Sequence, residues 1–175
     1  VWQHWMSETF GIEVVRDFWQ LRAEEPGSGV LESYAQVLEA YGLSWAESWS
    51  RFTAWNYLTA NRALPGMGYE EASHYPLGPA VETLNVYPGT VIGVVERLAA
   101  DFVRLLDLDG GWDGDLEIGL TLPEGSEVLT AVLVLERKDG TGAMEFMEMS
   151  SGTTLWHTSS VALHDIAAAG VIIAN

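Results

Sequence analysis

The sequence contains no cysteine. This absence excludes disulfide bonds, thiolate zinc sites, covalent haem attachment and a cysteine nucleophile. Long apolar runs are absent as well: no stretch approaches the roughly 20 apolar residues that a membrane helix requires. We therefore expect no membrane span. The chain opens at Val1 without a methionine or a signal peptide, so we expect a mature product or an excised fragment.

Basic residues are also scarce. Lys138 is the single lysine, and the 8 Lys and Arg residues stand against 25 Asp and Glu, for a formal net charge of −17. Nucleic acids and anionic membranes are bound by basic surfaces, so neither is expected as a partner. The acidity does not indicate disorder, because 48% of the residues are hydrophobic and 8 are tryptophan, enough for a real core.

Residues 1–63 have the apolar spacing of helices. Ser44 and Glu47 form a capping box that starts the last of these helices. Its apolar residues recur at steps of three and four, which is typical of a helix core seam, with an aromatic ligand platform as the alternative. The stripe consists of Trp45, Trp49, Phe52, Trp55 and Leu58.

The remainder of the chain changes character. Residues 64–89 are rich in Pro and Gly and are predicted to connect two parts. Residues 90–175 contain short strand patterns separated by turn signals, such as the alternating run 116–122 and the Asp139-Gly140 hairpin turn. We therefore predict an α+β protein, with an all-helical subdomain at residues 1–63 followed by a small antiparallel β-sandwich at residues 90–175.

Familiar catalytic motifs are missing. The sequence has no His-Glu-x-x-His, no Gly-x-Ser-x-Gly, no Gly-x-x-x-x-Gly-Lys and no strand-linked Gly-x-Gly-x-x-Gly. Of the four histidines, His4, His157 and His164 are predicted to be surface or edge residues. His74 has carboxylates and phenols nearby in sequence, yet such polar crowding is common in loops. We assign no catalytic residue in this chain.

One acidic loop is a candidate metal site. Between two predicted strands the chain places four carboxylates among three glycines, and calcium prefers oxygen ligands on tightly turning loops. Asp and Gly are also ordinary turn residues, so a solvated turn is the alternative. The possible calcium ligands are Asp107, Asp109, Asp113 and Asp115.

Two stretches resemble a known family. Residues 52–62, which read Phe-Thr-Ala-Trp-Asn-Tyr-Leu-Thr-Ala-Asn-Arg, are followed by Tyr69-Glu70-Glu71-Ala72 and Tyr75-Pro76. Together with Phe10-Gly11 and the helix pattern over residues 13–19, they resemble secreted bacterial metalloproteases of the gluzincin type. In that family a β-domain follows the helical part and ends in an apolar strand plus Asn, as residues 171–175 do here.

The resemblance implies that this chain is the C-terminal part of a secreted bacterial zinc peptidase. The zinc ligands would lie upstream, in a missing protease half that acts on peptide or protein substrates, so zinc is not expected to bind this chain. Glu8 is not assigned as a ligand, because the family's glutamate ligand lies further upstream. The chain alone would not be catalytic. The alternatives are a non-catalytic extracellular binding or adhesion module and a structural subunit that assembles through tryptophan-rich surfaces.

Overall fold

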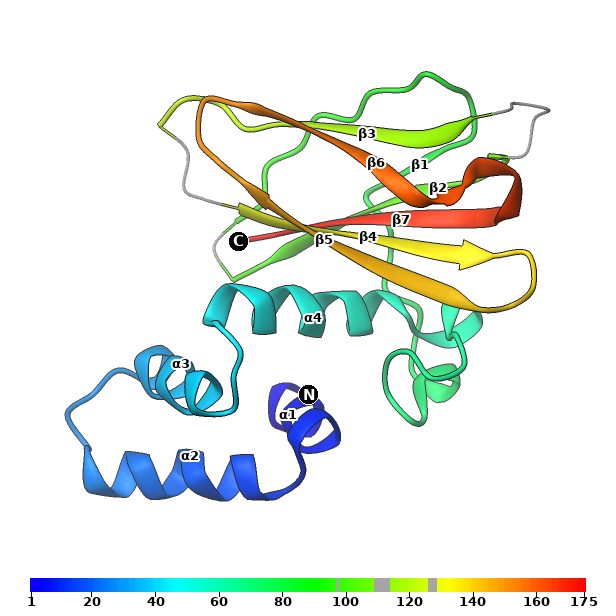
Figure 1. The fold of residues 1–175 in the computed structure, drawn as a ribbon. Coiled ribbons are helices and arrows are strands. Elements are labelled where there is room, and N and C mark those ends of the chain that lie inside the picture. The colour runs from blue at the N-terminus through cyan, green and yellow to red at the C-terminus, as the bar shows by residue number, and fades with distance from the viewer. Residues whose placement is uncertain (97, 109–113, 126–128) are drawn as a thin grey trace. The chain divides into compact units, whose positions relative to one another are not determined.

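A computed structural model describes residues 1–96, 98–108, 114–125 and 129–175 (Figure 1). The chain forms two compact units, Val1–Phe52 and Thr53–Asn175, which are described separately. Four helices are followed by strands that pair mainly antiparallel, so the predicted α+β class is confirmed. Within the described ranges, no helix has both the length and the apolar character needed to cross a membrane.

The first unit is helical. It contains α1 (Trp2–Phe10), α2 (Glu13–Glu24), α3 (Val30–Ala40) and most of α4 (Trp45–Tyr57). The predicted start of α4 is confirmed, because the Glu47 amide donates to the Ser44 hydroxyl at 3.2 Å.

The aromatic residues of this unit gather around Trp2. Its ring centroid lies 5.3 Å from that of Trp45, 5.7 Å from that of Trp49 and 4.9 Å from that of Phe52. These partners belong to the predicted stripe on α4 and are half-buried. In this part of the stripe, the interpretation as a core seam is therefore confirmed.

The second unit contains two sheets (Figure 1). The five-stranded sheet has the order β1-β2-β7-β4-β5, and β3 pairs with β6 in a separate ladder. Among the described strands, all pairs are antiparallel except β1 with β2, which run parallel. The strands are β1 (Glu82–Leu84), β2 (Ala100–Leu105), β3 (Asp115–Thr121), β4 (Leu129–Arg137), β5 (Gly142–Met149), β6 (Thr154–Ala162) and β7 (Ile166–Ala174).

Residues 64–89, predicted as a connector, include regular elements. They contain the single-turn 3-10 helix Ala72–His74 and the short edge strand β1. The sequence of residues 91–100 is ambiguous between helix and strand; residues 91–96, 98 and 99 adopt neither, and Ala100 begins β2. Strand β1 has no alternating pattern of its own, and it forms because β2 offers its free edge.

Each face of the five-stranded sheet carries its own apolar core. On one face Tyr57 and Leu58, from the end of α4 and the residue after it, pack against Val132, Val134 and Ile172. On the other face, inward residues of β2, β4, β5 and β7 meet those of β3 and β6, which completes the predicted β-sandwich. This double coverage explains why β4 is buried without interruption from 131 to 135.

Candidate functional site: an apolar cavity between the sheets

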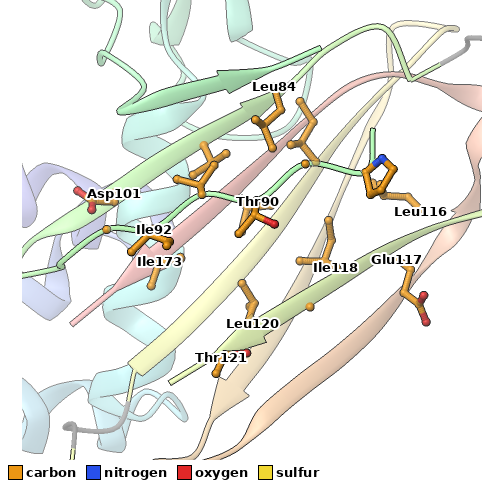
Figure 2. Close-up of a pocket in the computed structure, with 18 of the residues that line it drawn as sticks. Leu84, Thr90, Ile92, Asp101, Leu116, Glu117, Ile118, Leu120, Thr121 and Ile173 are labelled. Atoms are coloured by element: carbon orange, nitrogen blue, oxygen red, sulfur yellow. The ribbon is translucent and has the colours of Figure 1, made fainter. Parts of the chain in front are cut away.

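A cavity of about 750 Å³ lies between the two sheets of the second unit (Figure 2). The surrounding side chains are mostly aliphatic, and most of them come from β1, β2, β3 and β7 and from the segment between β1 and β2. The aliphatic lining includes Leu84, Val91, Ile92, Val103, Leu105, Leu116, Ile118, Leu120, Leu122, Val171 and Ile173.

The floor of the cavity follows from the alternation of β2. Asp101, Val103 and Leu105 face the cavity, whereas Phe102 and Arg104 face the opposite side, toward the end of α4. Strand β7 continues the floor, because Asp101 pairs with Ile173 and Val103 with Val171. Residues far apart in the sequence thus form one surface.

The opposite wall is β3. Leu116 and Leu120 are buried, and Ile118 lies between them on the same side of the strand. Glu117, between Leu116 and Ile118, and Thr121, directly after Leu120, are exposed on the other side of β3. The half-buried strand predicted from the alternation at 116–122 is therefore confirmed, and its apolar side is the cavity wall.

A segment without regular structure runs along the cavity between these walls. Tyr87 anchors its start, because its hydroxyl lies 2.8 Å from the Leu84 carbonyl oxygen and 2.7 Å from that of Leu106. Burial raises the pKa of Tyr87, which keeps the phenol protonated as a donor. Further along, Ile92 lines the cavity although 94% of its surface is exposed, so it marks the mouth.

Charge on the cavity lining is negative. The described lining residues include Asp101, Asp115 and Glu117 and contain no lysine, arginine or histidine. Asp115 and Glu117 lie on the exposed side of β3, whereas Asp101 is half-buried on the floor. Among the described residues, the Asp101 carboxylate has no hydrogen-bond or ion-pair partner. The lining is therefore an apolar surface with one half-buried carboxylate at its end (Figure 2).

A polar cluster joins the two sheets away from this mouth. Glu145 on β5 accepts a hydrogen bond from the Ser160 amide at 2.9 Å and another from the Ser160 hydroxyl. Its other carboxylate oxygen lies 2.5 Å from Nε2 of His157. Burial alone would raise the pKa of Glu145, but the hydrogen bonds from Ser160 and His157 together lower it below its usual value.

This cluster is not a serine hydrolase site. In such a site the serine hydroxyl forms a hydrogen bond with one nitrogen of the histidine ring, and the acid accepts a hydrogen bond from the other nitrogen. Here Glu145 is the shared partner of both Ser160 and His157. The cluster is a bridge between sheets, and sequence reasoning, which placed His157 at a surface or edge, did not find the pairing.

The structure describes two of the four predicted calcium ligands, Asp107 and Asp115. Asp109 and Asp113 lie outside the described residues. Asp107 is exposed with a left-handed φ of 55°, and Asp115 opens β3 at the surface. Calcium binding at this loop stays a prediction. The exposed aromatic ring of Trp156 covers Gly119 on the outer face of the β3-β6 ladder, and Trp19 on α2 of the first unit is exposed as well. Assembly through tryptophan-rich surfaces stays a prediction.

Comparison of the chain with protein-family models, with curated proteins and with solved structures finds no match. The resemblance to zinc peptidases therefore stays a prediction from the sequence.

Proposed function

We propose that the second unit is a non-catalytic binding module that holds a small apolar molecule between its sheets. The observation that supports this proposal is the 750 Å³ cavity with its aliphatic lining. Cavities that bind small organic ligands commonly measure about 300–1,000 Å³ and are lined mainly by apolar side chains. This function is a more specific form of the non-catalytic binding module that the sequence offered as an alternative to a peptidase fragment.

The mouth of the cavity supports the same function. Ile92 lines the cavity and exposes 94% of its surface. An exposed apolar residue at the mouth of a cavity is a favourable contact point for an apolar ligand, because each Å² of apolar surface removed from water contributes about 25 cal/mol. A ligand that enters past Ile92 would cover part of this surface.

The test is binding of the uncharged fluorophore N-phenyl-1-naphthylamine, whose emission increases in an apolar environment. We expect saturable fluorescence with the unaltered chain. Ile118→Trp should lower the signal by filling the cavity. Ile92→Asp should lower it by placing a charge at the mouth, and this exposed position leaves the core intact.

Val94→Asp is the matched control, since Val94 is exposed on the same segment and is not part of the lining. It should bind the fluorophore as the unaltered chain does. Absence of saturable binding to the unaltered chain, or equal binding by the Ile92→Asp and Val94→Asp variants, would refute the proposal.

A further inference from the structure

The sign of charge on the lining limits which apolar molecule fits, if the proposed binding function holds. A fatty-acid anion requires a cationic or hydrogen-bonding partner for its carboxylate when it leaves water. The described lining contains no basic side chain, and its half-buried charged group is the Asp101 carboxylate. An anionic head group would be repelled, so an anion carrier is disfavoured.

Asp101 is placed to receive a charged end group. Figure 2 shows it beside Ile92 and Ile173, at the end of the cavity opposite Leu116. A Cβ atom built on Gly93 would lie 3.4 Å from Oδ2 of Asp101, an ordinary van der Waals distance, so the segment that carries Ile92 passes close beside this oxygen. The carboxylate is half-buried and lacks a partner among the described residues.

The apolar surface extends away from this carboxylate. Leu84 and Thr90 lie between Asp101 and the far end, and Ile118 and Leu120 face them from β3 (Figure 2). An extended molecule would therefore place its charged end at the mouth and its hydrocarbon part between the sheets. The net charge of −17 also attracts cations to the protein, in addition to the attraction of a cation by the Asp101 carboxylate itself.

We propose that the cavity binds an amphiphile with a protonated amine, which pairs with Asp101 while its hydrocarbon chain lies along Leu84, Ile118 and Leu120. This inference rests on the proposed function and names its ligand class. The amine supplies the hydrogen-bond donors that Asp101 lacks, and the hydrocarbon covers the aliphatic walls. No covalent step is involved.

The test compares three probes of equal chain length by isothermal titration calorimetry: decylamine, decan-1-ol and decanoate. We expect decylamine to bind at least ~10-fold more tightly than decanoate, the effect of one charge-assisted hydrogen bond. Asp101→Asn should weaken decylamine binding by a similar ~10-fold factor and leave decan-1-ol binding within about twofold.

Asp165→Asn is the control, since it changes the net charge equally at an exposed residue outside the lining. It should leave decylamine binding unchanged. Equal binding of decanoate and decylamine would overturn the inference and leave the proposed function standing. An equal loss of decylamine affinity in the Asp101→Asn and Asp165→Asn variants would do the same. Failure of all three probes to bind, together with absent fluorophore binding, would overturn the proposed function itself.

Discussion

Nε2 of His157 lies 2.5 Å from a carboxylate oxygen of Glu145, and this contact joins the outer strands of two different sheets. Glu145 is on β5, at the edge of the five-stranded sheet, and His157 is on β6 of the two-stranded ladder. The same carboxylate receives the Ser160 amide. A single partly buried side chain thus connects the sheets that enclose the cavity.

Glu145→Gln should lower the free energy of unfolding by about 1–3 kcal/mol, because the amide weakens charge-assisted hydrogen bonds in a largely buried place. Urea unfolding followed by tryptophan fluorescence measures this change. Glu148→Gln is the control, since it removes the same charge from an exposed position on the same strand. Equal, small effects of both substitutions would show that the bridge does not stabilise the sandwich.

The bridge should also make stability depend on pH. In the folded state, the hydrogen bonds from Ser160 and His157 lower the pKa of Glu145 below its ordinary value. A lowered folded pKa means that the stabilisation is complete above the unfolded pKa and disappears as the pH falls through the folded pKa. The difference in unfolding free energy between the unaltered chain and Glu145→Gln should therefore be largest at neutral pH and shrink below about pH 4.5.

Urea titrations at several pH values between neutrality and pH 3 check this expectation. Other acidic groups with lowered pKa, such as Asp17 and Asp139, are present in both proteins, so the difference isolates Glu145. A difference that stays constant down to pH 3 would contradict the assignment of the lowered pKa to this carboxylate.

Local patterns were sufficient to predict several strands. The period-two run at 116–122 became β3, and Asp139-Gly140 became the turn between β4 and β5, with Gly140 at a φ of 82°. These features depend on neighbouring residues: alternation selects a half-buried strand, and a left-handed turn position favours glycine. For the same reason the start of α4 is predictable from the Ser44 and Glu47 capping box.

The site could not be predicted in the same way, because it depends on pairing between distant segments. Asp101 meets Ile173 through the β2-β7 register, and nothing in either strand specifies that partner. Glu145 and His157 bind each other across two sheets. The alternating sequence of β3 predicts the apolar wall of the cavity, but it does not predict that a cavity lies against this wall. Contacts of this kind are set by the packing of the whole unit.

Arg104→Lys should destabilise the second unit by about 1–2 kcal/mol, because lysine cannot reproduce a bidentate pair. The Arg104 guanidinium donates to both carboxylate oxygens of Glu136, at 2.7 and 3.0 Å, and also to the Tyr57 hydroxyl at 2.8 Å. Both ends of the pair are mostly buried. Chemical unfolding measures the loss.

Arg16→Lys is the comparison for this substitution, since Arg16 forms its ion pairs at the exposed surface of α2. Exposed pairs contribute only about 0–1 kcal/mol, so the control should change stability little. If Arg104→Lys lowers the free energy of unfolding no more than Arg16→Lys does, the bidentate pair with Glu136 stabilises the protein no more than an ordinary surface ion pair.

Gly170 is predicted to be intolerant of even one added methyl group. A Cβ atom at this position would lie 2.4 Å from the Tyr57 ring, and Tyr57 is fully buried where α4 meets the sheet. Gly170→Ala should therefore lower the free energy of unfolding by about 1–3 kcal/mol, the usual cost of overpacking a core. Gly27→Ala, with nothing within 4 Å, should be neutral. Urea unfolding of both variants separates the two effects, and a Gly170→Ala protein as stable as Gly27→Ala would mean that Tyr57 has room to move.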